Sequence, residues 1–542
     1  MAAWIPIGLI IFSLVFFVHK SLREKSKANT LLNFFQYGSG FKKKSFFATL
    51  LASNSGLCGA VYLIIVYGYF YGLGVFWWMI CFWILTQIGS VYTIKKVDQL
   101  RSGFVSKNGT LHEFLGSMFH STKVRMVAGA FSTIVYLGLV AAELVLGYEV
   151  LRAFIPGSVQ IFGFSLVPLV FLLCLALIVV YYASRSGFRA IVATDKIQLT
   201  LIVIMIFSVL GFIVSHYSSF VESYTTHFVS LLDIRSVFDP LGEGVLSFLF
   251  FFVFMNLIFW GAWWPAAMDQ WHRVAATKSS KSALDKYYGT LSVGSVLYFA
   301  LLSFTFLAVG SITRILVETA DGATQPLYYF LTEIVSSIGG SSVAVFVGAF
   351  GAGLIVLGLV ALIISTVDTY LVVAGQSLVS DIILARRYRQ SLSEMDGSLS
   401  KRNHEVELRF SRRVVLFLFV PVILFFFLIT RLADVFTTIY FFFSFQMVEL
   451  GALIVCFLLK DRMRLCSKSM LCGMVVGGLW ALVTNIYLVF TINSMTLVGL
   501  VTEVMFYYNL LYANLAATLI VTLLVYFIVC YFSSRKRLRL IV

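Results

Sequence analysis

The sequence predicts an all-helical membrane protein with many spans. Of its 542 residues, 60% are hydrophobic and only 12% are charged, about half the charged fraction of an ordinary soluble chain. Many apolar stretches approach or exceed the roughly 20 residues that a helix needs to cross a bilayer. They are too long and too continuous for the strands of a membrane barrel. The net charge of +15 does not indicate nucleic-acid binding, because no basic-aromatic module accompanies it.

We predict thirteen spans, each of which begins where an apolar run begins. Their expected first residues are Trp4, Ser45, Tyr69, Met126, Phe162, Phe188, Leu246, Gly289, Val343, Val414, Val435, Met470 and Ala513. Lysine and arginine mark cytoplasmic loops, and nearly all of them fall in alternate segments. The exceptions are Arg152, Lys196, Arg235, Arg314 and Arg431. This asymmetry predicts a multi-pass protein of the plasma (cytoplasmic) membrane, with its N-terminus outside and its C-terminus in the cytoplasm.

Polar residues cluster at 362–369, inside the long apolar run of span nine. In a helix Ser365, Asp368 and Thr369 share one face, and Thr366 lies about 100° round from Ser365. A membrane-buried carboxylate is costly unless it is paired, and a bound cation would pair it. Hard cations take oxygen ligands. Alternatively, the hydroxyls bond to carbonyls one turn back, but that interpretation leaves Asp368 unexplained.

Residues 52–59 in span two, Ala-Ser-Asn-Ser-Gly-Leu-Cys-Gly, predict a break in the helix. Small polar residues and the glycines Gly56 and Gly59 weaken a helix in mid-membrane. Unwound backbone at that depth lines a cavity or an ion site. The alternative is a close-packed surface of small residues. Asn54 favours the break, because packing alone does not need a polar group.

Two further spans carry isolated polar side chains. Glu143 in span four is a candidate for lining the pore; otherwise it pairs within the bundle, or lies near the outer surface with Glu149 and Arg152. Span eleven carries Gln446 and Glu449 at i and i+3 in a Phe-rich run.

Span six places Asp195 and Gln198 at i and i+3, about two turns in from its cytoplasmic end. Asp195 is a second carboxylate within the membrane. Its neighbour Lys196 points about 100° away and does not pair well with it. We expect Lys196 to extend to the inner surface.

Tryptophans crowd the end of span seven, as Trp260, Trp263 and Trp264. Pro265 follows and removes a helical hydrogen bond, so a kink or break is expected there. Aromatics beside a break suit a solute pocket, although the same pattern is typical of an interfacial belt. We assign Trp260 and Trp264 to the pocket and Trp271 to the belt. His272 is expected in a loop and not in a proton relay.

No motif predicts an enzyme. The sequence contains no His/Cys cluster with metal spacing, no nucleotide-binding loop and no Ser/His/Asp set. The seven cysteines lie in spans or near basic loops, which argues against a disulfide framework.

Several stretches together resemble the sodium:solute symporter family, the carriers of sugars, proline, sialic acid and pantothenate. The resemblance runs from about Asn33 to Lys460. Its most specific piece is the pattern from Ser186 to Gln198. Supporting pieces are Ala52-Ser-Asn-Ser, Thr110-Leu-His-Glu-Phe-Leu, Asp269-Gln-Trp-His-Arg-Val-Ala-Ala-Thr-Lys and Ser365-Thr366.

The resemblance implies a LeuT-type fold of two inverted five-helix repeats, at residues 45–216 and 217–460. Residues 1–44 would form an extra N-terminal helix and a basic loop, and 461–542 two peripheral helices and a short basic tail. Spans two and seven would be the discontinuous helices.

The resemblance also implies ion sites. One Na⁺ site would use the carbonyls of Ala52, Ser55 and Leu362 with the hydroxyls of Ser365 and Thr366. A second would use Asp195, Ser365, Asp368 and Thr369. Three residues depart from the family pattern, namely Asp368 in place of a hydroxyl residue, Ser186 in place of a glycine, and Lys196 after the aspartate. The extra carboxylate would strengthen a second cation site, bind a proton instead, or disable coupling.

We therefore expect a sodium-coupled symporter that imports a small organic solute, amino-acid-like ahead of sugar. The solute would contact Asn54, Gly56, Gly59, Glu143, Trp260, Trp263, Trp264 and Gln446. Na⁺ would be co-transported and not a prosthetic group. We expect a monomer in the lipid bilayer that binds no nucleic acid. The alternatives are a proton-coupled carrier using Asp368 or Glu143, and a solute sensor without net transport. Sensors usually append a soluble output domain, and this chain ends about ten residues beyond its last predicted span.

Overall fold

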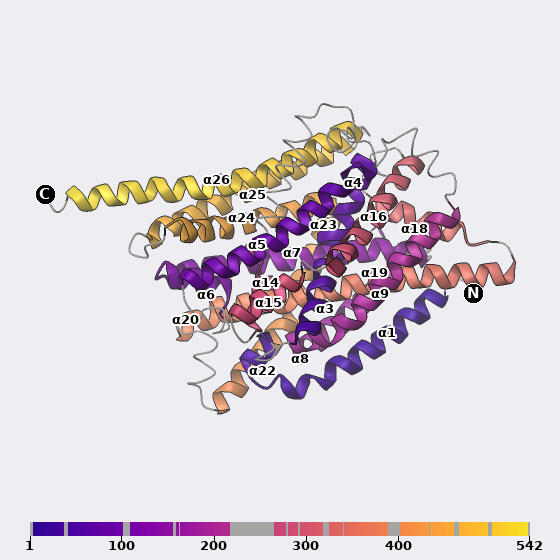
Figure 1. Cartoon of the computed structure of the whole chain (residues 1–542), viewed down its shortest axis with the longest axis horizontal. Helices are drawn as coiled ribbons and strands as arrows, with labels where there is room; N and C mark the ends of the chain where they lie inside the picture. Colours follow the sequence, from indigo (N-terminus) through magenta and orange to yellow (C-terminus); the bar gives the residue numbers. More distant parts are fainter. Residues whose placement is uncertain are drawn as a thin grey trace.

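The protein is a bundle of long helices whose axes run roughly parallel (Figure 1). The computed structural model describes residues 4–36, 42–100, 109–155, 159–161, 163–216, 265–277, 280–290, 293–317, 325–339, 341–388, 401–432, 434–459, 465–496 and 501–539. Within these residues the only strands are β1 (Gln160–Ile161) and β2 (Phe164–Ser165), a short antiparallel pair between two helices.

The first half of the chain forms the indigo to magenta helices of Figure 1. In order they are α1 (Trp4–Arg23), η1 (Lys25–Lys27), α2 (Leu31–Gln36), α3 (Lys43–Asn54), η2 (Leu57–Tyr62), α4 (Leu63–Tyr71), η3 (Gly72–Val75), α5 (Phe76–Leu100), α6 (Leu111–Met118), α7 (Thr122–Phe154), α8 (Leu166–Ser186) and α9 (Phe188–His216).

The second half continues from red to yellow. Its helices are α14 (Met268–Ala275), α15 (Ser280–Thr290), α16 (Val293–Leu316), α18 (Pro326–Ser336), α19 (Ser342–Gln376), η6 (Ser377–Leu384), α20 (Ala385–Tyr388), α22 (Lys401–Phe417), α23 (Phe419–Leu432), α24 (Val435–Leu458), α25 (Ser467–Thr496) and α26 (Val501–Arg539).

Eleven helical stretches of the described chain are long and apolar enough to cross a membrane. One of them, Leu57–Leu100, covers the second half of predicted span two and all of span three. Predicted span seven begins at Leu246, outside the described residues. The predicted thirteen spans are compatible with this arrangement.

Two predicted boundaries were wrong. Span three begins at Phe76 and not at Tyr69, because α4 continues to Tyr71 and Gly72 then turns the chain with φ of +64°. The helix of predicted span ten begins at Lys401, ahead of the expected Val414.

Helices α7 and α19 form the centre of the bundle. Helix α19 packs against α9 and α7, and α7 also packs against α23 and α24. Helix α7 is apolar on all sides and almost wholly buried, as expected for a helix surrounded by others. Residues on α7 and α19 are therefore held by packing from several directions.

Glycines allow α4 and α16 to touch at their backbones. A Cβ atom at Gly310 would lie 1.9 Å from the carbonyl oxygen of Ile65, and one at Gly68 would lie 2.2 Å from that of Leu307. Small residues at such crossings are the usual means of close approach between membrane helices. This contact joins the second half of span two to span eight.

A buried polar network ties α6 to the bundle. His112 donates through Nδ1 to Asp381 (2.8 Å) and through Nε2 to Ser132 (2.8 Å), and Ser132 donates to Glu449 (2.9 Å). Arg125 donates to the other oxygen of Asp381 (2.9 Å). Burial alone would lower the pKa of His112, but the two carboxylates raise it to about 9. The network joins α6, α7, η6 and α24.

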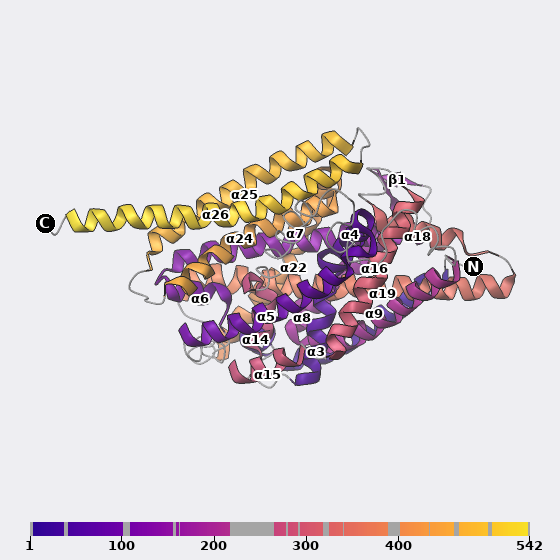
Figure 2. The same cartoon turned by 45° about the horizontal axis from the view of Figure 1, so that its top comes forward.

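The last two helices lie at one edge of the bundle (Figure 2). Helix α26 packs along α24 and α25. The hydroxyl of Tyr512 on α26 donates to that of Tyr67 on α4 (2.7 Å), and Asn485 on α25 donates to Ser444 on α24 (2.7 Å). These edge helices thus make polar contacts with the core as well as apolar ones.

Candidate ion and solute site

The predicted break in span two is confirmed. Helix α3 ends at Asn54, Gly56 has extended backbone angles (φ −48°, ψ 144°), and the chain becomes helical again at Leu57. A Cβ atom at Gly56 would lie 2.5 Å from Thr366 Oγ1 and 3.1 Å from Glu143 Oε1. Only glycine leaves room for α7 and α19 to approach the break this closely.

Three helices bring oxygens together on one side of the break. Ser365 on α19 donates to Asp195 Oδ1 on α9 at 3.0 Å, and Thr49 on α3 donates to Asp195 Oδ2. Ser53 on α3 lies 3.5 Å from the hydroxyl of Thr369 on α19. All of these residues are buried. The exposed side chain of Lys196 points away from Asp195.

Asp368 completes this group. It is fully buried, lies close enough to Asp195 for their charges to repel, and accepts a hydrogen bond from Tyr182 on α8 at 2.7 Å. Thr369 Oγ1 is 3.5 Å from its other oxygen. The four residues predicted for a second ion site therefore form one cluster. Sequence reasoning missed Tyr182, because nothing in span five indicates that its hydroxyl meets span nine.

The residues predicted for the first ion site lie where α3 and α19 face each other, but their hydroxyls have other partners here. Ser365 donates to Asp195, while Thr366 donates to Leu362 O in its own helix at 3.0 Å. The second bond is the arrangement that the simpler interpretation expected. Ser55 and Ala52 are buried at the end of α3. The carbonyl and hydroxyl ligand set stays a prediction.

Among the described residues of this region, buried aspartates outnumber buried arginines. Arg273 on α14 is fully buried, forms an ion pair with Asp269 (2.9 Å) and donates to Thr49 O (3.4 Å). It is the one cation among the described residues that acts on Asp195, and it is already paired with Asp269. Unpaired charge at this depth is costly. The carboxylates, hydroxyls and carbonyls present here suit a monovalent hard cation or a proton. No group of three His, Cys, Asp or Glu side chains arranged to hold a metal ion occurs in the described ranges.

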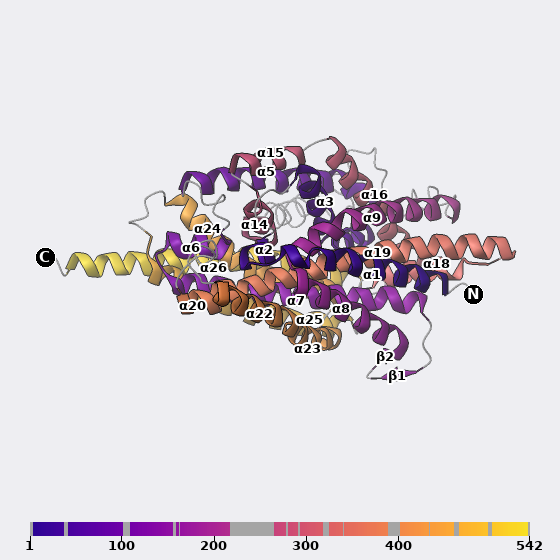
Figure 3. The same cartoon turned by 90° about the horizontal axis from the view of Figure 1, so that it is seen from below.

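Helix α14 packs against α19, α2 and α3 at one end of the site, and Figure 3 shows it below α5. Its eight residues are all buried. Gln270 donates to Asn54 Oδ1 at 2.7 Å, and Tyr136 on α7 donates to Asp269 at 2.9 Å. Asn54 is thus occupied by a protein partner.

The other residues predicted to contact the solute lie in different environments. Gly59 is partly accessible although it lies within the bundle, and a Cβ atom there would meet only the Tyr370 hydroxyl, at 3.7 Å. Gln446 on α24 is fully buried, and its amide atoms have no hydrogen-bond partner within the described part of the chain. Glu143 reaches the break itself, as described below. Trp260, Trp263 and Trp264 lie outside the described residues.

Two predictions near Pro265 were wrong. Trp271 is not in an interfacial belt: it is 5% exposed, and its Nε1 donates to Pro265 O at 2.8 Å. His272 is not in a loop but in α14, fully buried against Phe188. Both follow from the break, because Ala267 is extended and α14 starts afresh at Met268, turned into the bundle.

Comparison with known proteins supports the fold. No family model matches the chain, and no curated protein matches its sequence. Among solved structures, a Na⁺-coupled sialic acid symporter in a substrate-bound, outward-open state superposes with a TM-score of 0.63 at 16% identity, covering 97% of each chain. Mhp1, a nucleobase-cation-symport-1 family transporter in a closed conformation, gives a TM-score of 0.41 at 13% identity, over 94% of this chain and 96% of its own. The first of these similarities shows that the chain has the LeuT-type fold that the sequence predicted.

Proposed function

We propose that this protein is a secondary transporter that couples the import of a small organic solute to Na⁺ by alternating access. The observation that carries the proposal is the cluster of Asp195, Ser365 and Asp368 beside the helix break at Gly56. A resident ion would bridge α3, α9 and α19. The structural similarity to a Na⁺-coupled symporter supports the same function.

In the proposed cycle, Na⁺ holds α3 against α19 and favours the outward-open arrangement. Solute then binds at the break, and rocking of one group of helices exposes both ligands to the cytoplasm. One charge that crosses 100 mV contributes about 2.3 kcal/mol, a solute gradient of roughly 50-fold. A second Na⁺ would square that factor. The tryptophans predicted for the pocket, Trp260, Trp263 and Trp264, favour an amino-acid-like solute over a sugar.

The predicted topology belongs to this proposal. An outside N-terminus, a cytoplasmic C-terminus and repeats at 45–216 and 217–460 follow from the charge asymmetry and from the family resemblance. They place η6, α20 and α22 at the cytoplasmic end, and β1 and β2 outside. Na⁺ is a substrate in this scheme, and no enzymatic step is involved.

The test is transport by the full-length protein in liposomes. An inward Na⁺ gradient should drive solute uptake, and replacing Na⁺ by K⁺ or choline at equal ionic strength should abolish it. Thermal-shift screening against amino acids, amines, sugars, carboxylates and vitamins, with and without Na⁺, identifies the solute for this assay. If Na⁺ neither stabilises the purified protein nor drives uptake of a solute that binds, the proposal is wrong.

Proton coupling is the second candidate, and one observation favours it. Asp368 and Asp195 repel each other, and two adjacent carboxylates can be relieved by one proton as well as by Na⁺. Uptake in Na⁺-free buffer, driven by an inward proton gradient, distinguishes this mechanism from the first.

A further inference from the structure

A carboxylate of the protein itself occupies the start of the second half-helix of span two. Glu143 on α7 is fully buried, and its Oε1 accepts the backbone N–H of Cys58 at 2.8 Å. The N–H of Gly59 and the hydroxyl of Thr366 also lie close enough to favour the charged carboxylate. The half-helix runs without interruption from Leu57 through η2 and α4 to Tyr71. Free N–H groups at a helix start attract anions, and here Glu143 has taken that position.

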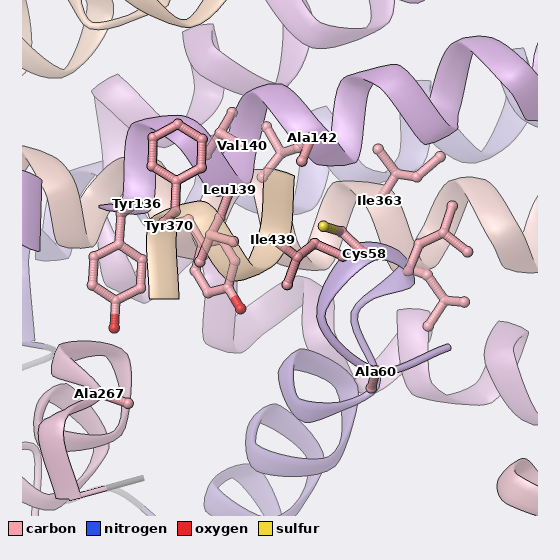
Figure 4. Close-up of a cluster of buried hydrophobic side chains, with 14 of the residues drawn as sticks. Cys58, Ala60, Tyr136, Leu139, Val140, Ala142, Ala267, Ile363, Tyr370 and Ile439 are labelled. Atoms are coloured by element: carbon pink, nitrogen blue, oxygen red, sulfur yellow. The ribbon is translucent and has the colours of Figure 1, made fainter. Parts of the chain in front are cut away.

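Glu143 belongs to a buried group of residues from three elements. On α7, Glu143 and Tyr136 are seven residues apart and share a face, about 10 Å from each other along the axis. On α19, Thr366 and Tyr370 share a face at i and i+4. Gly59 lies between them, partly accessible, with the Tyr370 hydroxyl opposite. In the view of Figure 4, Ile439 is drawn next to Cys58, and Tyr136 stands farther along on the opposite side of the group.

The carboxylate has capacity left for a ligand. Its Oε2 is buried and has no hydrogen-bond partner within the described ranges. Within the described part of the chain, the polar groups that stabilise the charged form of Glu143 are those of Cys58, Gly59 and Thr366, and none of these groups is cationic. The rings of Tyr136 and Tyr370 lie 5.0 Å apart on the side of this group away from Glu143. Tyrosine faces attract organic cations.

We propose that Glu143 binds the ammonium group of the solute, so that the transported molecule is a small organic amine and not a carboxylate. The inference rests on the proposed transport function and specifies its substrate class. A solute carboxylate would be repelled by the carboxylate of Glu143, which already accepts from the backbone at the break. An ammonium group would balance that charge and place its apolar part toward Tyr136 and Tyr370.

The test is ligand stabilisation of the purified full-length protein, with and without Na⁺. The amine probes are ethanolamine, choline, putrescine and phenethylamine; the carboxylate probes are propionate, lactate and 3-phenylpropionate. At least one amine should stabilise the wild type, and Glu143→Gln should weaken its affinity tenfold or more. Glu149→Gln is the matched control, because it removes a carboxylate from the same helix, where Glu149 pairs with Arg152, and it should bind as the wild type does.

The other outcomes separate a failure of the amine assignment from a failure of the proposed Na⁺ coupling. Stabilisation by carboxylates and not by amines, by no amine at all, or by an amine equally in Glu143→Gln overturns the assignment. Glu143→Asp, which keeps the charge, should retain the preference for amines and guards against misfolding of the glutamine variant. The Na⁺-induced shift without solute should survive in Glu143→Gln. Its absence from the wild type would instead contradict the proposed Na⁺ coupling, so the two failures are distinguishable.

Discussion

The hydroxyl of Ser365 donates a hydrogen bond to Asp195 at 3.0 Å, which joins two helices that are 170 residues apart in the chain. A threonine of α3 holds the second oxygen of the same carboxylate. Asp195 therefore connects the first half of the broken helix to α19. Whatever neutralises Asp195 would control how firmly these helices are held together.

Asp195→Asn should weaken Na⁺ coupling without unfolding the protein. The amide keeps the volume and one acceptor oxygen, for either Ser365 or Thr49, but it removes the charge that attracts a cation. Because about 1.4 kcal/mol corresponds to tenfold in binding, we expect half-maximal uptake at tenfold higher Na⁺ or more. Lys196→Gln is the control, since Lys196 is exposed beside it. Unchanged Na⁺ dependence in Asp195→Asn would count against this ion site.

Asp368→Asn tests how many Na⁺ ions are transported with each solute molecule. If the carboxylate pair serves a second Na⁺, the Hill coefficient for Na⁺ should fall from about two toward one, because one attractive charge is lost. Tyr182→Phe, which removes the 2.7 Å hydrogen bond to Asp368 but no charge, should leave the coefficient unaltered. A coefficient of one in the wild type, with uptake that responds to pH and loses this response in Asp368→Asn, would indicate a bound proton instead.

Gly310→Ala should destabilise the contact between α4 and α16. The new methyl group would lie 1.9 Å from Ile65 O and 2.6 Å from Tyr69 N, and backbone atoms cannot rotate aside. Overpacking of this kind costs about 1–3 kcal/mol, to be measured as a lower melting temperature in detergent. Gly211→Ala is the matched control, as nothing lies within 4 Å of its added carbon. Equal melting temperatures for the two variants would show that α4 and α16 accommodate the added methyl group without loss of stability.

Stability should fall at alkaline pH because of His112. Its folded pKa of about 9 exceeds its ordinary value of 6.5, so the folded state binds this proton more tightly than the unfolded state. The resulting stabilisation, about 3 kcal/mol at most, is complete below pH 6.5 and is lost as the pH rises through 9. The groups that face the ring are Asp381, Glu449, Ser132 and the neighbouring His272.

The measurement is the melting temperature of wild type and His112→Gln between pH 6 and 10. The difference between the two should shrink as the pH approaches 10, since the wild type loses its charge and the variant has none. Ser117→Ala, on the same helix α6, supplies a control for changes in α6 itself. A difference that stays constant across this range would mean that His112 is not held as a cation.

Local patterns predicted the helix breaks correctly. Gly56 and its small polar neighbours indicated the first break, and Pro265 indicated a second, after which α14 begins at Met268. Both signals are intrinsic to the backbone: glycine adds freedom, and proline removes a hydrogen bond. The grouping of Ser365, Asp368 and Thr369 on one helix face also follows from helical spacing alone.

Local patterns did not predict which residues on distant helices contact each other. Nothing near Glu143 in sequence indicates that it accepts the N–H of Cys58, 85 residues earlier. His272 and Trp271 were misplaced for a related reason. Polar and aromatic residues beside a break are typical of a membrane surface, but here α14 turns inward and buries both. Burial depends on the direction of the chain after the break, which spacing does not encode.

The sequence by itself determined a helical membrane protein, its approximate spans, the position of the first break and the grouping of polar residues on one face of span nine. Those properties depend on hydrophobicity, helical period and backbone chemistry, which act over a few turns. Only the tertiary structure decided that Asp195, Ser365 and Asp368 share one cluster and that Glu143 occupies the helix start. Such contacts join helices far apart in sequence, and packing of the whole bundle selects them.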